Sequence, residues 1–437
     1  MPSCRATGCS WRVRNLIFNR VSIKEKLLKP QLAAAFSAVL VMLFGLALLN
    51  LNSRLSLSLR FASYDWAHDL SFVKLHPPAD AGITIIYLDE ASYIDFHQPF
   101  NQPWDRAIHA RLLDRLAADG AKVVVFDIVF SDPGLNPAAD QVFAEAIRRN
   151  GRVILAADYS ENHSTSDASG RSQEKTLIQP YAPFAEAAAG WGIAQLQPDE
   201  DFLVRQHNHG PPDENFVSLT WAVARRLQLP VAANDAARFQ ERWINYYRSP
   251  DNFQSFSYKL ALDKPPGFYR DKIIFIGGSP QTGLLRDRKD QFRSPYTTWY
   301  SNPVFTPAVD VHATILHNLI GEDWLQRLSP VGEWLALLFG SLFFGAGLMR
   351  FRPSAAVGIA ALGALGFMLG MLLLFGLTRV WFPWLVVVAA QAPLGLLLAI
   401  SFKSVEWYVL RRDLERQRER SQSKIIEQAA QIGRAHV

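Results

Sequence analysis

Residues 82–90 are GITIIYLDE, and they indicate the fold of the central part of the chain. Its continuous apolar run ends in two acids, which predicts a buried strand. Apolar residues then recur at helical spacing over residues 106–118 until Gly120, and residues 122–126 form a second, β-branched run. Strand, helix and strand with short joints predict a right-handed βαβ unit with parallel strands.

The same alternation of strands and helices continues along the chain. We expect helices over residues 138–149, 216–227 and 309–320, strands over 152–157, 243–247 and 272–276, and an exposed loop over 160–174. Alternating elements of this kind indicate an α/β domain with a largely parallel sheet.

Three of the predicted strands end in residues suited to binding a ligand. Two acids follow the first strand, a single acid follows the second, and a glycine pair follows the strand at 272–276. Ligands of open parallel sheets lie beyond the carboxyl ends of the strands, so neighbouring strands would bring these groups together around a cation, an amine or a hydroxyl group. The alternative is that Asp and Gly simply end strands and begin turns. The candidate ligand-binding residues are Asp89, Glu90, Arg106, Asp127, Gly277 and Gly278.

The chain shows no sequence motif for catalysis or for a cofactor. Residues 277–283 lack the Lys-Ser or Lys-Thr of a P-loop, and nucleophile-elbow, zinc-protease and kinase motifs are absent. The histidine pairs are His207 with His209 and His312 with His317; they have no cysteine partners, and a spacing of five does not place two residues on one helix face. We therefore predict no catalytic residue, no cofactor and no metal, which leaves an extracellular hydrolase as an unsupported alternative.

Four apolar segments flank and follow the α/β region. They cover residues 32–51, 334–349, 355–377 and 380–402. About 20 apolar residues at ~1.5 Å per residue cross the ~30 Å hydrocarbon core of a bilayer. The sequence therefore predicts one N-terminal and three C-terminal transmembrane helices around a large domain at residues 52–330. In the third helix, Gly366 and Gly370 permit close contact with another helix.

Basic residues predict the orientation of these helices. The tail over residues 1–31 carries seven Lys and Arg against one acid, which marks it as cytoplasmic. The turn at 350–353 and the chain after residue 402 are then cytoplasmic as well, and residues 52–330 lie outside. An aromatic belt at the outer interface would contain Trp324, Trp334, Trp381 and Trp384. A cleaved signal peptide is the alternative for the first helix, but its long basic region and poor cleavage site favour an anchor.

Charge and cysteine content limit the partners of the chain. The formal net charge is +5, and much of the excess lies in the N-terminal tail, where it suits anionic lipid headgroups better than nucleic acid. The two cysteines, Cys4 and Cys9, lie in the same tail, so the large domain has no disulfide and depends on its hydrophobic core.

The last apolar segment and the chain after it carry the candidate signal-transmission residues. Gln391 and Pro393 interrupt the apolar run, and proline kinks a helix, so a hinge is predicted there beside the alternative of ordinary packing. Leu410 and Leu414 continue an apolar stripe along a predicted juxtamembrane helix over residues 403–431. Such a stripe favours pairing with a second copy in a homodimer, and a single solvated helix is the alternative.

These features together resemble a known family of receptors. The matching segments are residues 85–89 and 104–106, 112–130, 201–205 and 217–219, 244–246 and 272–277, and 290–295 and 309–313. The chain resembles bacterial receptors with a type-2 CHASE domain, the cyclase/histidine kinase-associated sensory extracellular domain, from about residue 54 to residue 402. Phe202 and Ala308 stand where such domains usually have glycine, which bears on turn geometry.

The resemblance implies an unknown small-molecule or physical stimulus outside a bacterial inner membrane and a signalling output inside. Family members continue into a histidine kinase, a nucleotide or diguanylate cyclase, or a Ser/Thr kinase; we expect a histidine kinase, acting on a response regulator, before a cyclase. Residues 432–437 match the translation of a sequencing adapter, so we expect a non-native tail on a chain truncated before its output domain. The alternative is a standalone membrane-anchored binding protein.

Overall fold

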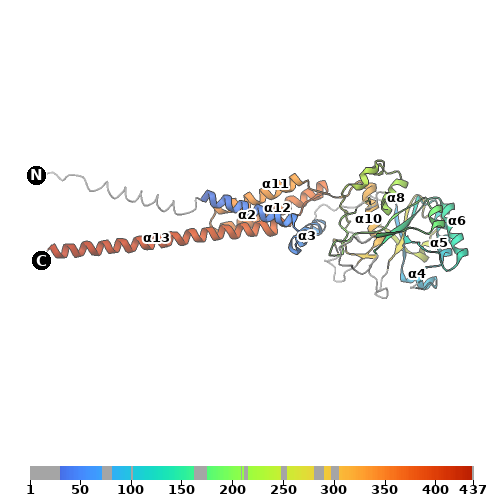
Figure 1. The fold of residues 1–437 in the computed structure, drawn as a ribbon, viewed down its shortest axis with the longest axis horizontal. Helices are drawn as coiled ribbons and strands as arrows, with labels where there is room; N and C mark the ends of the chain where they lie inside the picture. The colour runs from blue at the N-terminus through green and yellow to red at the C-terminus, as the bar shows by residue number, and fades with distance from the viewer. Residues whose placement is uncertain are drawn as a thin grey trace. The chain divides into compact units, whose positions relative to one another are not determined.

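The computed structural model describes residues 30–70, 81–99, 102–161, 175–207, 209–210, 215–247, 253–279, 290–296 and 305–435. The predicted basic tail before residue 30 and most of the predicted loop at 160–174 lie outside these residues. The chain divides into two compact units, whose elements are labelled in Figure 1. The α/β unit comprises Asp65–Arg327 and Leu374–Trp381, and the membrane unit comprises the rest of the described chain.

A seven-stranded sheet with the order β4-β3-β2-β7-β1-β6, and with β5 beside β3, forms the centre of the α/β unit. Its strands are β1 (Ile83–Leu88), β2 (Val123–Val129), β3 (Val153–Glu161), β4 (Lys175–Ile178), β5 (Gly190–Ile193), β6 (Gln254–Ser257) and β7 (Ile273–Gly278). Only the β3–β4 pair in this sheet is antiparallel. The structure therefore confirms the predicted α/β fold with a largely parallel sheet.

Helices cover both faces of this sheet, as Figure 1 shows for α5 and α6 on one side and α8 and α10 on the other. The helices are α4 (Glu90–Asp95), α5 (Arg106–Asp119), α6 (Pro137–Asn150), α7 (Ala182–Ala187), α8 (Leu219–Arg226), α9 (Tyr258–Leu262) and α10 (Ala308–Gly321). In β2, Val124 and Phe126 pack on the α5 face while Val123 and Val125 pack on the α10 face. This burial of both faces explains why the strands are continuous apolar runs. Gly120 ends α5 in a left-handed conformation with φ 82°.

The strand predicted at residues 243–247 is wrong. Among the described residues, Trp243 alone in this stretch makes β-bridges, to Gln206 and to Leu325. The amide of Asn245 donates instead to the side chain of Asn318 at 2.8 Å, and the amide of Tyr246 lies 3.3 Å from the ring of His68. Side chains thus take the hydrogen bonds that a neighbouring strand would need.

Four helices in the described chain are long and apolar enough to cross a membrane, as predicted. They are α2 (Pro30–Asn50), α11 (Pro330–Gly340) with its π-helical and 3₁₀ continuations η5 (Ser341–Gly347) and η6 (Leu348–Arg350), α12 (Pro353–Thr378), and η7 (Val386–Gln391) continuing into α13 (Ala392–Ala435). The predicted start of the last segment at residue 380 is wrong. Val380 and Trp381 form a short strand, β11, because they pair with β10 (Gln326–Arg327).

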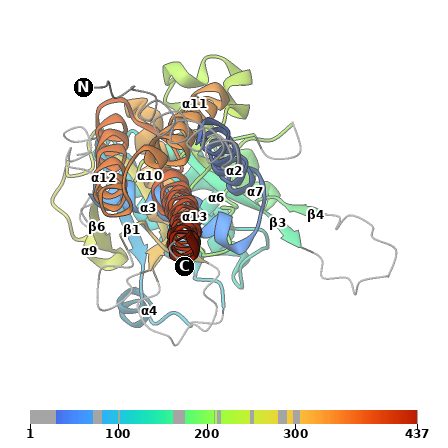
Figure 2. The same ribbon diagram turned by 90° about the vertical axis from the view of Figure 1, so that its left-hand side faces the viewer.

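Small residues let three helices of the membrane unit approach closely. A side chain at Gly345 in η5 would lie 2.7 Å from the backbone of Ala38 in α2, and one at Gly395 in α13 would overlap the carbonyl of Phe344. Figure 2 looks along α13 and shows α2 and α11 gathered around it. Gly366 and Gly370 in α12 have no neighbour within 4 Å of such a side chain among the described residues, so within one copy they make no close helix contact.

Candidate functional site

The carboxyl ends of β2, β7 and β1 lie side by side in the sheet, as the predicted site requires. The register places Asp127 opposite Gly277 and Gly277 opposite Tyr87, so these three residues form one row across the strands. Residues in register on parallel strands share a face, and this row faces α10. The row is the core of the candidate site.

Gly277 brings α10 close to the sheet. A side chain at this position would put its Cβ 2.7 Å from the Cβ of Val309, whereas a Cβ at Gly278 would meet none of the described residues within 4 Å. The close approach places the first turn of α10 over the row, and the hydroxyl of Tyr87 donates a 2.8 Å hydrogen bond to Asp310 Oδ1. Glycine is therefore needed at residue 277 for packing.

Asp127 and His312 meet inside this site. Their Oδ1 and Nε2 atoms are 3.7 Å apart, and the side chain of His312 is fully buried. Burial raises the pKa of Asp127 to about 8, with the nearby carboxylates of Asp290, Asp158 and Asp310 adding to the effect. Burial lowers the pKa of His312 to about 4. Both groups are therefore neutral at pH 7, and their contact is not an ion pair at that pH.

Two further histidines extend the polar region behind His312. The rings of His207 and His209 lie 4.7 Å apart, and those of His207 and His312 lie 6.3 Å apart. Burial lowers the pKa of His207 to about 3 and that of His209 well below its ordinary value. A cavity of about 10 Å³ beside His207 and His209 has room for about one water molecule. Within the described residues, no group of three or more His, Cys, Asp or Glu is arranged to hold a metal.

The other predicted binding residues lie apart from this row. Asp89 is the N-cap of α4, where it accepts from the Ser92 amide at 2.9 Å and from the Ser257 hydroxyl at 3.2 Å, and Glu90 opens the same helix. Arg106 packs on the α5 face, 3.9 Å from Asp140 and 4.5 Å above the ring of Phe130. The structure thus brings Asp127 and Gly277 together and assigns Asp89 and Arg106 local contacts elsewhere.

A buried ion cluster around Arg205 was missed in the sequence. The Arg205 guanidinium contacts Asp65 and Asp199 at 2.9 Å and Asp201 at 2.7 Å, and only 1% of its side chain is exposed. Asp65 lies on α3 (Arg54–Leu70), the helix that follows the first membrane helix. Burial raises the pKa of Asp65 to about 6 although the charge of Arg205 opposes this change. The acids Asp199 and Asp201 shortly before Arg205 could have indicated an ion pair in the sequence. The third partner, Asp65 on α3, lies too far away in the sequence to be inferred from this segment.

A second missed feature is a ladder of short main-chain pairings. The amide of Ile244 donates to the carbonyl of Arg205 at 2.9 Å, and Trp243 exchanges hydrogen bonds with Leu325. β10 then pairs with β11 in parallel, and the rings of Trp243 and Trp381 lie 4.2 Å apart. The end of α12 and β11, residues Leu374–Trp381, are therefore part of the α/β unit. The side chain of Trp381 is buried in this contact.

Gln391, a predicted signal-transmission residue, is a fully buried polar side chain in the membrane unit. Its Nε2 donates to the carbonyls of Val41 in α2 at 3.2 Å and Leu337 in α11 at 3.3 Å. Side chains at Gly45 and Gly340 would overlap its amide group, so these glycines make the space for it. Gln391 thus links three helices.

Pro393 and the apolar stripe lie on or beyond the same helix. The π-helical segment η7 ends at Gln391, so the irregular turn lies just before Pro393, which lacks the amide needed to continue a regular ladder. Leu410 and Leu414 remain 44% and 52% exposed on α13. Their stripe is therefore open in a single copy.

The α/β unit has three layers, and apolar helices precede and follow it in the sequence. This architecture is that of a membrane-anchored α/β domain. A family model described as the CHASE2 domain matches residues 37–346, so the chain belongs to the CHASE2 family. CHASE2 is an extracellular sensory domain of signalling receptors. No curated protein and no solved structure matches the chain.

Proposed function

We propose that the chain is the sensory and transmembrane part of a bacterial receptor, with the N-terminus in the cytoplasm and the α/β unit outside the inner membrane. The CHASE2 match, the four apolar helices and the basic residues beside them support this arrangement. The message leaves along α13 towards a cytoplasmic output domain. A histidine kinase with a response regulator is our first expectation for that output, and a nucleotide or diguanylate cyclase is the second.

The observation that carries the proposal is the pairing of β10 with β11. Gln326 pairs with Val380 and Arg327 with Trp381, so the α/β unit holds β11, and residues 382–385 separate this strand from η7, which begins at Val386. The main-chain hydrogen bonds of the parallel pair and the contact between the rings of Trp243 and Trp381 together hold β11 against β10. A change of the α/β unit that moves β10 therefore moves the start of the last membrane helix.

Arg205 connects this ladder to α3, the helix that follows the first membrane helix in the sequence. Its carbonyl accepts from Ile244, next to the Trp243 bridge, while its guanidinium holds Asp65 on α3. Arg205 thus contacts α3 directly, and Ile244 places it next to the pairings that run from Trp243 through Leu325 to β10 and β11. We propose that the ladder and the Arg205 cluster together transmit the signal.

The row around Asp127 is our proposed stimulus-responsive centre. We keep the predicted binding role for Asp127 and Gly277 and propose that Tyr87, Asp310 and His312, which lie around them, belong to the same site. Its buried carboxyl groups suit a proton or another small cation. Asp89, Glu90 and Arg106 have a structural role in this proposal.

The experiment uses pH to perturb the α/β unit of the full chain in lipid nanodiscs. A fluorophore insensitive to pH, attached at Leu414→Cys in a background without Cys4 and Cys9, reports on α13. Raising the pH from 6 to 9 ionises Asp127 and should change the emission of the label. The change should vanish in Asp127→Asn.

A second variant tests the route. In Trp381→Ala, the α/β unit should still show the pH-dependent shift of its melting temperature, but the label on α13 should no longer respond. An unchanged label in the unsubstituted chain, with a normal shift of the α/β unit, would refute the proposed transmission.

A further inference from the structure

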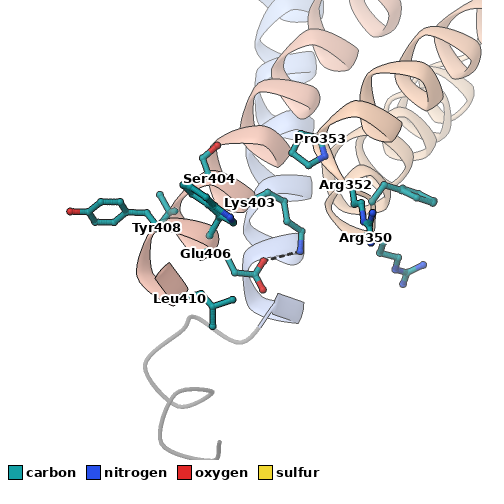
Figure 3. Close-up of a pocket in the computed structure, with 11 residues that line it drawn as sticks. Arg350, Arg352, Pro353, Lys403, Ser404, Glu406, Tyr408 and Leu410 are labelled. Atoms are coloured by element: carbon teal, nitrogen blue, oxygen red, sulfur yellow. Dashed lines mark hydrogen bonds and ion pairs between the residues drawn. The ribbon is translucent and has the colours of Figure 1, made fainter. Parts of the chain in front are cut away.

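A cavity of about 890 Å³ lies at one end of the membrane unit, where η6 meets α12 and where α13 leaves the apolar region. Figure 3 shows that the turn before α12 supplies one wall and that the part of α13 after residue 402 supplies the other. The residues that line it include Arg350, Phe351, Arg352, Lys403, Trp407 and Tyr408. Its volume is in the range of about 300–1,000 Å³ found for ligand sites.

The cavity carries an excess of positive charge. Lys403 is neutralised by Glu406, whose Oε2 lies 2.8 Å from the Lys403 Nζ. Arg350 and Arg352 are exposed, and neither pairs with a carboxylate in the part of the chain that the structure describes. A guanidinium presents a planar fork of donors that matches a phosphate group. The guanidinium groups of the two arginines can therefore bind an anionic ligand.

The same cavity exposes large aromatic side chains. Trp407 and Tyr408 are 61% and 59% exposed, and Phe351 is 42% exposed. They lie close to the end of the apolar part of the last membrane helix, at the level where amphipathic rings meet lipid headgroups. An occupant of this cavity therefore has an anionic head and an apolar body.

We propose that this cavity binds an anionic phospholipid, with Arg350 and Arg352 on the phosphate and Trp407 against the acyl chains. This location favours a lipid over a protein partner because both walls lie at the ends of membrane helices. The bound lipid would join the α11–α12 turn to the first turns of α13 outside the apolar region. It would thereby set the direction in which α13 leaves the membrane.

The test measures quenching of Trp407 by lipids in the full chain. The chain is reconstituted in nanodiscs of phosphatidylcholine that contain either brominated phosphatidylglycerol or brominated phosphatidylcholine. Subtracting the signal of Trp407→Phe isolates this one tryptophan among the 12 of the chain. Brominated phosphatidylglycerol should quench it more strongly than brominated phosphatidylcholine.

The double variant Arg350→Gln/Arg352→Gln should lower the preference for the anionic lipid by about 20- to 30-fold, the size expected for two cationic contacts at a membrane surface. The matched control is Arg416→Gln/Arg418→Gln, which removes the same charge from exposed positions further along α13. The control should keep the preference. Equal quenching by both lipids, or an equal loss in the control, would overturn the proposal; a melting temperature shared by all variants verifies that they are folded.

Discussion

Replacing Asp127 by asparagine removes a buried carboxyl group while keeping its shape. In the folded chain, burial raises the pKa of Asp127 from 3.8 to about 8. A group that binds its proton more tightly in the folded state contributes stability that is present at low pH and is lost as the pH rises towards the folded pKa. At about 1.4 kcal/mol for each tenfold change in proton affinity, complete ionisation costs the folded state about 5–6 kcal/mol.

The buried histidines have the opposite dependence, because their lowered pKa values cost stability as the pH falls below about 6.5. Comparing Asp127→Asn with the unsubstituted chain at each pH cancels that contribution. The advantage of the variant in the free energy of unfolding should therefore grow by about 1.4 kcal/mol per pH unit, or about 2 kcal/mol between pH 6.5 and 8.

The assay is denaturant unfolding of the α/β unit in the full chain, followed at several pH values. Asp132→Asn changes an exposed carboxylate on the loop after β2 and is the matched control. It should differ from the unsubstituted chain by the same amount at pH 6.5 and 8. A pH-independent difference for Asp127→Asn as well would refute the argument that Asp127 holds a proton in the folded state.

Three further outcomes are expected. Arg205→Ala should cost about 3–5 kcal/mol of stability, because it leaves partly buried carboxylates unpaired, and equal unfolding midpoints would contradict this. Gly277→Ala should cost about 1–3 kcal/mol because it pushes α10 away from the sheet, whereas Gly278→Ala should change stability by less than about 0.5 kcal/mol; similar melting temperatures would contradict the difference. Leu410→Cys in a background without the native cysteines should form cross-linked dimers under oxidation, and Arg412→Cys on the opposite side of α13 should not.

The sequence predicts the βαβ unit and the parallel sheet because their signals are local. Apolar periodicity and the glycine after each helix are contained within short segments such as residues 106–120. The membrane helices are predictable for the same reason, because the length of each apolar segment is enough to identify it. The strand at 243–247 failed because β-branched and aromatic composition cannot show that side chains from Asn318 and His68 take its hydrogen bonds.

The site was only partly predictable because it depends on which face each residue occupies. The strand ends were expected to converge, and β2, β7 and β1 are neighbours. Asp127, however, faces α10 while Arg106 packs on the opposite side of the sheet, a division that needs the sheet order and the helix positions together. The Arg205 cluster depends on Asp65, which lies 140 positions earlier in the chain. Pairings over such distances leave no periodic signal.

The pairing of β10 with β11 has a consequence for building hybrid receptors. A sensor cut out at residues 52–330, the boundary that hydropathy suggests, would leave β11 behind with the membrane helices and would expose one edge of β10. The transplanted domain would then lack β11, the strand that pairs with its β10. A working exchange must instead place its second junction after Trp381, so that the donor supplies both α11 and α12 together with its sensor.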